Sequence, residues 1–175
     1  MAFARVGDSI YFHGAAANRT LKALTSGIES CVTVTLLDGL VLARSAFHHS
    51  MNYRSVMLFG TAVRVNDPDE KLSAVLAILD HLVPGRSEDA RPPSPSELRA
   101  TQVVRFAIED GSAKVREGGP IEEAEDLGLG VWAGELPIEL VTMAPVPDEA
   151  MADGVGMPSY VARYRIRRVA RVPGD

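Results

Sequence analysis

Two short polar segments contain residue types that suit the binding of a phosphorylated ligand. The first spans residues 13–19, where His13 and Gly14 end a predicted strand, and Asn18 and Arg19 open a predicted helix. Free N–H groups at a helix start attract anions, small side chains let a phosphate approach, and a guanidinium can grip phosphate oxygens in two places. An ordinary strand–helix junction is the alternative interpretation.

The second segment, residues 48–56, places hydrogen-bonding side chains between two apolar strands. It reads as the lip of a binding site or as a polar connection. His48 and His49 are adjacent, and on an extended chain they point to opposite faces, so we predict no metal ion held by both. The candidate binding residues of this segment are His49, Asn52, Tyr53, Arg54 and Ser55.

No motif of an independent catalytic centre is present. The sequence has no Gly-x-Ser-x-Gly, Walker or Rossmann glycine pattern, and the single Cys31 is expected to be a packed thiol. His81 is expected on a helix surface, and the acidic residues of 121–126 in a solvated loop. A bound cofactor that supplies the chemistry fits this absence, and we assign no catalytic residue.

Composition limits the class of protein. The 175 residues carry a net charge of −5, which argues against general nucleic-acid binding. No apolar run approaches the roughly 20 residues that span a membrane, and no signal peptide is evident, so we expect a cytoplasmic protein. The arginines between Arg163 and Arg171 form a basic tail, interpreted as a solvated terminal segment, with a nucleic-acid or membrane contact as the alternative.

The first half of the chain predicts strands around one short helix. We expect a strand at 9–13 and a helix at 18–24, with Gly27 as its C-terminal cap. Residues 31–37 alternate between apolar and polar side chains, and Asp38-Gly39 predicts a hairpin turn into a strand at 40–47. A further strand is expected at 53–65.

The second half begins with a helix that Asp67 caps and Pro84-Gly85 ends. Residues 86–93 are expected to form a loop, and Ser94 to cap a second short helix. Residues 102–109 and 112–116 predict an antiparallel pair that turns at Asp110-Gly111. Because hairpins dominate and no βαβ rhythm appears, the sequence predicts an α+β fold with a small antiparallel barrel and inserted helices.

Several segments resemble the pyridoxamine 5′-phosphate oxidase-like flavoproteins, in the branch called flavin-nucleotide-binding or nitroimidazole-reductase-like. Residues 11–19, YFHGAAANR, are similar to the YxHGxxxSR segment of that branch. Residues 32–44 and 48–56, with Gly60, resemble its most diagnostic stretch, and residues 112–116 and 131–134 resemble it less specifically. The resemblance covers about residues 1 to 140.

The resemblance implies a split β-barrel that dimerises and binds FMN in a groove between the subunits. His13, Gly14, Asn18 and Arg19 would then face the FMN phosphate or ribityl chain, and Tyr53, Arg54 and Ser55 would line the rest of the site. It implies a split-barrel domain at residues 1–145 and a C-terminal extension with the basic tail at 146–175. Members of the family usually begin with about 40–50 more residues, so the first barrel strands are expected to be missing.

The resemblance therefore implies an FMN-dependent oxidoreductase of unidentified small-molecule substrate. A true pyridoxamine phosphate oxidase is not expected, because Tyr164-Arg165-Ile166-Arg167-Arg168 lacks the histidine of that enzyme's C-terminal segment. Two alternatives stay open: a flavin or haem carrier without turnover, and a structural remnant without cofactor.

Overall fold

The computed structural model describes residues 1–166 and contains a seven-stranded antiparallel sheet. The strand order is β1-β2-β5-β4-β3-β7, with β6 paired to β4 outside this path. The strands are β1 (Phe3–Val6), β2 (Ser9–Ala15), β3 (Glu29–Leu42), β4 (Ser50–Arg64), β5 (Thr101–Ala107), β6 (Asp110–Arg116) and β7 (Gly134–Pro137). The helices are α1 (Arg19–Leu24), α2 (Pro68–Leu82), α3 (Arg86–Asp89), α4 (Pro95–Ala100) and α5 (Ser159–Ala162), with 3-10 turns η1 (Ala46–His48) and η2 (Asp126–Gly128). The predicted α+β fold is confirmed.

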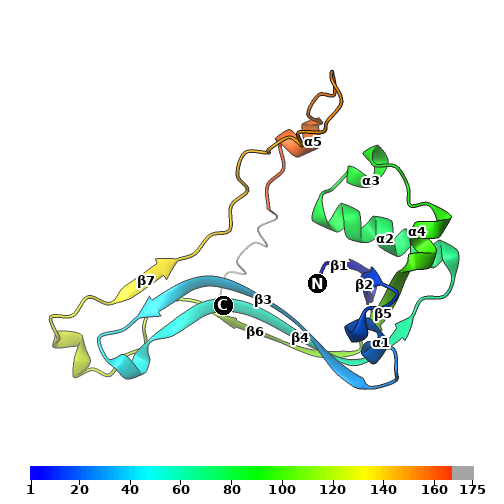
Figure 1. Ribbon diagram of the computed structural model, residues 1–175. Coiled ribbons are helices and arrows are strands. Elements are labelled where there is room, and N and C mark those ends of the chain that lie inside the picture. The colour runs from blue at the N-terminus through cyan, green and yellow to red at the C-terminus, as the bar shows by residue number, and fades with distance from the viewer. Residues whose placement is uncertain (167–175) are drawn as a thin grey trace.

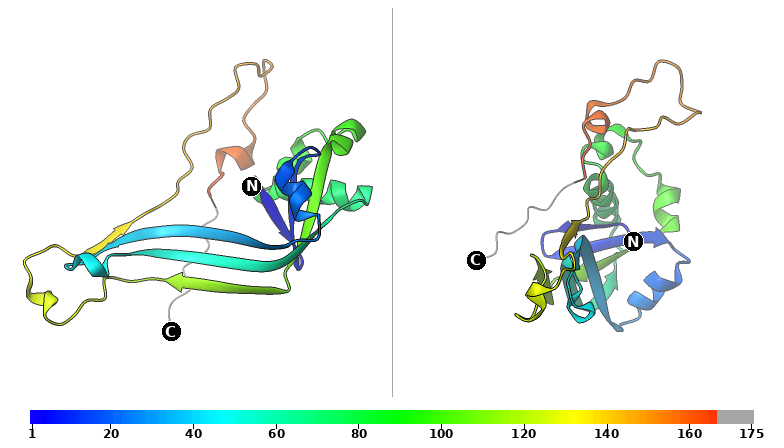
Figure 2. Two further views of the ribbon diagram at one scale, coloured as in Figure 1. Left: turned by 60° about the horizontal axis from the view of Figure 1, so that its bottom comes forward. Right: turned by 90° about the vertical axis from the view of Figure 1, so that its left-hand side faces the viewer.

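The molecule consists of a body and a long arm (Figure 1). The body holds β1, β2, β5 and the helices α1 to α4, and the arm holds β3, β6, β7 and most of β4 (Figure 2). Strand β4 joins the two parts, because Ala62–Arg64 pair with β5 and Tyr53–Phe59 pair with β6. Between these pairings lies Gly60, where a Cβ would stand 3.5 Å from the core ring of Phe106.

The sheet of the body is covered on both faces. One face carries Phe12 and Phe106, which pack with Leu21 of α1 in one buried cluster. The other face carries Val103, which packs with Ala74 of α2 in a second cluster. Because successive side chains of a strand point to opposite faces, neighbouring residues of β2 belong to different layers.

The predicted hairpin turn at Asp38-Gly39 is wrong. Strand β3 runs straight through these residues, which form a bulge in its pairing with β4, and the chain reverses between Leu42 and Ser50 instead. The Arg54 guanidinium donates two hydrogen bonds to the Asp38 carboxylate, with Nε–Oδ2 and Nη2–Oδ1 distances of 2.9 and 2.8 Å. Gly39 is buried under β7, where a Cβ would stand 3.0 Å from the Leu136 carbonyl oxygen. Asp-Gly suits a bulge as well as a turn, and these long-range contacts select the bulge.

The predicted pairing of residues 102–109 with 112–116 is also wrong. Strands β5 and β6 do not pair with each other, because both pair with β4, one in the body and one in the arm. Gly111 permits this arrangement by close approach, since a Cβ there would lie 2.7 Å from the Met57 carbonyl oxygen. Gly111 therefore lies at a close contact between β6 and β4, at a position where the sequence predicted a turn.

The predicted helix starts are confirmed. The Asp67 carboxylate accepts from the N–H groups of Asp69 and Glu70, and Ser94 and Glu97 form a complete capping box. Two details differ from the sequence prediction. Helix α1 ends at Leu24 and is capped by Thr25 instead of Gly27, and the short helix α3 forms in the expected loop 86–93.

After β7 the chain crosses back from the arm toward α2, as residues 138–166, named the strap (Figure 1). The Tyr160 hydroxyl donates to Asp89 at 2.6 Å, and the Tyr164 hydroxyl donates to the Leu82 carbonyl at 2.8 Å. Between α2 and the strap lies a mainly apolar cavity of about 430 Å³. Most of the predicted basic tail, from Arg167 onward, lies outside the described residues.

Within residues 1–166, no helix has the length and apolar character needed to cross a membrane.

Candidate functional site

The two predicted binding segments lie far apart within one chain. Arg64 of β4 pairs with Val104 of β5, which pairs with Phe12 beside the first segment. Arg54 of the second segment precedes Arg64 by ten residues of continuous strand. At about 3.3 Å per residue, the segments are separated by roughly 30 Å along β4. The first segment therefore meets β4 in its body half, where α1 also contacts the strand, and Tyr53 and Ser55 lie in its arm half.

At the first segment, the structure gives two of the predicted residues a packing role. The Asn18 side chain caps α1 by accepting from the Leu21 N–H at 3.1 Å. A Cβ on Gly14 would stand 3.0 Å from the Leu21 side chain, so this glycine makes room for the helix. Arg19 lies at the exposed start of α1, a helix of six residues.

His13 points to the other face of the sheet. It lines a cavity of about 290 Å³ beneath α2 and α4, together with Val75, Arg91 and Glu97. Its Nδ1 atom is buried and has no hydrogen-bond partner among the described residues. The alternation of β2 therefore separates His13 from Gly14 and from the start of α1.

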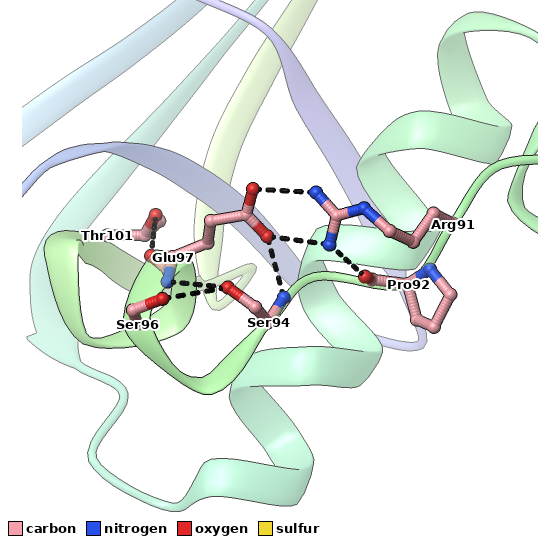
Figure 3. A network of polar contacts seen from close by, with 6 residues as sticks. All are labelled: Arg91, Pro92, Ser94, Ser96, Glu97 and Thr101. Atoms are coloured by element: carbon pink, nitrogen blue, oxygen red, sulfur yellow. Dashed lines mark hydrogen bonds and ion pairs between the residues drawn. The ribbon is translucent and has the colours of Figure 1, made fainter.

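The rim of this cavity is fixed by an ion pair (Figure 3). Arg91 donates to both carboxylate oxygens of Glu97, at 2.8 and 3.0 Å, and Glu97 also accepts from the Ser94 N–H at 2.6 Å. The Arg91 guanidinium, followed by the Ser94 contacts, lowers the pKa of Glu97 to about 2. Because its charge is matched by Glu97, Arg91 is not a free cation for an anionic ligand.

At the second segment, the alternation of β4 divides the predicted residues between the two faces of the arm. Tyr53 and Ser55 share one face, which we call the open face. His49 lies directly before β4 with an extended backbone, so the same alternation places it on the open face. Asn52 and Arg54 point to the opposite face. Arg54 pairs with Asp38, and the buried Asn52 donates to Glu135 at 2.7 Å and accepts from Arg116. These two residues hold the arm together.

A polar row crosses the open face at Ser55. Its Oγ lies 2.8 Å from Thr35 Oγ1 on β3, and Lys114 of β6 is its register partner on the other side. Two hydroxyls and an ammonium on adjacent strands can bind phosphate or ribityl oxygens. Thr35 and Lys114 were missed by the sequence analysis, although the alternation of residues 112–116 puts Lys114 on one face with Ser112 and Arg116.

The arrangement thus supplies binding groups without a catalytic set. The open face offers hydroxyls and a cation on a rigid sheet, and the body offers the exposed guanidinium of Arg19 and the unpartnered Nδ1 of His13. No nucleophile lies beside a general base in these groups. Redox or transfer chemistry at this surface would have to come from a bound cofactor.

Comparison with solved structures gives two close neighbours over nearly the whole chain. The flavocytochrome Anf3 from Azotobacter vinelandii is 41% identical, with a TM-score of 0.88, and the match covers 94% of this chain and 77% of that one. The FAD and haem binding protein from Mycobacterium smegmatis is 38% identical, with a TM-score of 0.86 and coverages of 91% and 78%.

A third neighbour agrees in fold alone. It is a putative 5-nitroimidazole antibiotic resistance protein from Bacteroides thetaiotaomicron, 23% identical with a TM-score of 0.52, covering 65% of this chain and 64% of that one. No curated protein matches the sequence closely enough to count as a relative.

The family model described as pyridoxamine 5′-phosphate oxidase matches residues 1–115. That span contains both predicted binding segments. It also contains strands β1 to β6, except for the last residue of β6. Together with the two close neighbours, it confirms the predicted split-barrel class. The chain belongs to the pyridoxamine 5′-phosphate oxidase family.

Proposed function

We propose that this protein binds a flavin nucleotide and a haem, and that it passes electrons between them and a small molecule. The observation that carries the proposal is the match of more than nine-tenths of the chain to two structures named for flavin and haem binding. The polar row of the open face supports it, because its hydroxyls and ammonium suit the phosphate or ribityl oxygens of such a nucleotide.

The identity of the flavin has two candidates. The motif resemblance predicts FMN, whereas the neighbour from Mycobacterium smegmatis is named for FAD. We favour FAD, because that neighbour matches 91% of the chain at 38% identity, and the motifs alone do not distinguish the two nucleotides. Mass spectrometry of the released flavin decides between them.

A homodimer with the flavin between the subunits is part of the proposal. Within one chain the two binding segments meet β4 in different halves of the strand, and in the proposed dimer the arm of one copy lies against the body of the other. The arm also exposes apolar side chains on the face opposite the polar row, where a partner would cover them. These are Val34, Leu36, Val56 and Val115.

In this dimer, Arg19 of one copy would complete the surface formed by Tyr53, Ser55 and Lys114 of the other, whereas His13 lies on the other face of the body sheet. A bound flavin supplies one- and two-electron transfer, and the protein contributes binding, orientation and exclusion of water. Asn18, Gly14, Asn52 and Arg54 would act by holding α1 and the arm in place, as their contacts indicate.

The experiment that tests the proposal is an absorbance spectrum of the purified protein, with flavin identified by mass and haem measured as the pyridine haemochrome. We expect flavin bands and a Soret band, each near one equivalent per chain. A protein that retains neither cofactor, and ignores added FMN, FAD and haemin, would overturn the proposal.

The same preparation separates an oxidoreductase from a carrier without turnover. An oxidoreductase consumes NAD(P)H or another reductant continuously in the presence of an electron acceptor. A carrier is reduced once, to the extent of its bound cofactors, and then stops.

A further inference from the structure

At the tip of the arm, a hydrogen bond fixes the tautomer of His49. His49 follows η1 with an extended backbone, and its Nδ1 lies 3.0 Å from the Ser45 carbonyl oxygen. A carbonyl oxygen can only accept, so Nδ1 carries the proton of this hydrogen bond. In the neutral ring the lone pair then lies on Nε2. Histidines that ligate a metal are commonly oriented by such a hydrogen bond from the other ring nitrogen to a carbonyl.

Beside His49 the open face is flat, apolar and uncovered. Met51, Leu40 and Leu136 are register partners on three adjacent strands, and their exposed fractions are 50, 37 and 46%. Trp132 lies next to them, because its ring atoms come within 3.0 and 3.1 Å of the position of a Cβ on Gly134. The Trp132 side chain is 63% exposed, so the indole borders the surface without closing it. We call this surface the tip platform.

At the tip, the opposite face of the arm is buried, although farther along the arm the same face exposes Val34 and Leu36. Val41 and Asn52 point there and are buried, and the Glu122 carboxylate of the following loop is also covered, where it pairs with Arg44. The tip is therefore buried at Val41 and Asn52 on one face and exposed at Met51, Leu40 and Leu136 on the other. A planar apolar ligand would fit the bare face and would bury the exposed side chains.

One imidazole does not make a site for a free metal ion, and within residues 1–166 no group of three His, Cys, Asp or Glu side chains could hold one. Haem needs fewer ligands from the protein, because the porphyrin supplies four nitrogen ligands to the iron and the protein adds only axial ones. The tip platform together with His49 therefore matches the chemistry of haem better than that of a bare ion.

The other histidines fit less well. His81 of α2 lies against Phe3, with ring centroids 5.1 Å apart, and no apolar platform adjoins it. The ring of His48 is edge-on to Phe47 at 5.3 Å. His13 borders a cavity of about 290 Å³, which is at the lower limit of the roughly 300–1,000 Å³ typical of sites for drug-sized ligands.

We propose that Nε2 of His49 is an axial ligand of the haem iron and that Met51, Leu40, Leu136 and Trp132 form the apolar surface under the macrocycle. The inference rests on the haem binding proposed above and assigns it to residues of this chain. The predicted absence of a metal site held jointly by His48 and His49 is compatible with it, because only His49 takes part.

The test compares His49→Ala with His81→Ala and His13→Ala in the full-length protein, each purified and reconstituted with haemin. We expect His49→Ala to lower haem affinity at least tenfold or to change the Soret and electron paramagnetic resonance spectra. Flavin content and circular dichroism should stay as in the wild type. Added imidazole should restore the wild-type spectrum to His49→Ala, as an external ligand replacing the side chain. The His81→Ala control should keep haem and its spectrum.

The outcomes separate this assignment from the proposed function. A wild-type protein that does not bind haem refutes both. A wild-type protein that binds haem while His49→Ala keeps the same affinity and spectrum refutes the assignment alone. Loss of haem from His13→Ala or His81→Ala with His49→Ala unaffected also refutes it, and moves the haem to the body.

Discussion

Lys114 is the cation that the arm offers to a phosphorylated ligand. It is the register partner of Ser55, whose hydroxyl is paired with Thr35, and within residues 1–166 its ammonium has no hydrogen-bond or ion-pair partner. The arginines nearby are already engaged, since Arg54 pairs with Asp38 and Arg116 donates to Asn52. In the proposed function, flavin binding depends on Lys114, whose ammonium is not engaged by another side chain of residues 1–166.

Substituting Lys114→Gln should weaken flavin binding, because it removes one charge-assisted contact to a phosphate while keeping a polar side chain of similar length. We expect about a tenfold rise in the flavin dissociation constant, or about 1.4 kcal/mol. Fluorescence quenching of titrated FMN and FAD measures it. Arg64→Gln, which removes an exposed cation at the body end of β4, is the matched control and should bind flavin normally. Equal affinities for both variants would remove Lys114 from the site.

Glu97 should make stability depend on acid pH. Its pKa of about 2 in the folded protein lies below the 4.5 of an unperturbed glutamate, so the stabilisation is complete above pH 4.5 and disappears as pH falls toward 2. Glu97→Gln should therefore be less stable than the wild type at pH 6, and the difference should shrink at pH 3. Urea unfolding at low salt measures both values.

The matched control for this prediction is Glu88→Gln, which removes an exposed carboxylate of α3 that has no ion pair among the described residues. Its stability difference from the wild type should change little over the same pH interval. A constant difference for Glu97→Gln between pH 6 and pH 3 would contradict the lowered pKa.

At the scale of the elements, β4 is the strand that unites body and arm. Its two ends pair with different strands on the same edge, β5 near Ala62 and β6 near Ser55, and close backbone approach at Gly111 keeps β6 in register. The arm is therefore joined to the body through one continuous strand. The pairing of β6 with β4 depends on a glycine position that admits no side chain.

Gly111→Ala should detach the start of β6 from β4. The new Cβ would lie 2.7 Å from the Met57 carbonyl oxygen and 2.9 Å from Leu58 Cδ2, so the backbone must move. We expect a loss of about 1–3 kcal/mol in the free energy of unfolding, the usual range for overpacking. Faster amide exchange in residues 110–116 would locate the change. Gly119→Ala, which would meet no atom within 4 Å, should be near neutral. Equal stability of the two variants would show that β6 is not tightly paired.

At the scale of the whole molecule, the arm projects from the body (Figure 2). It exposes apolar side chains on the face opposite the polar row. A second copy that covers this face would also bring a body to the open face. The proposed dimer thus accounts for two features at once, the apolar exposure and the separated binding segments.

Val56→Lys should disrupt the proposed dimer, because it places a charge in the middle of the apolar face, where the valine is 41% exposed. Light scattering after gel filtration should give a dimer for the wild type and a monomer for the variant, which should also lose flavin. Val6→Lys, at an exposed valine of β1 in the body, should remain a dimer. A monomeric wild type, or a dimeric Val56→Lys, would contradict the proposed interface.

The sequence by itself determined the features that depend on near neighbours. Asp67 and Ser94 open helices as predicted, because a cap needs only the next three residues of the chain. The alternation of residues 31–37 likewise predicted a strand with two different faces. The family followed from segments at 11–19 and 32–56, and the family model confirms it over residues 1–115.

Only the tertiary structure decided which segments meet. Asp38-Gly39 and Asp110-Gly111 both suggested turns. Both lie within strands that pair with β4, the first as a bulge, because contacts with Arg54, Leu136 and Met57 outweigh local turn preference. The polar row of Thr35, Ser55 and Lys114 has members on three strands, so no local pattern could join them. Strand pairing depends on residues distant in sequence, and for that reason the binding surface became visible only in the folded chain.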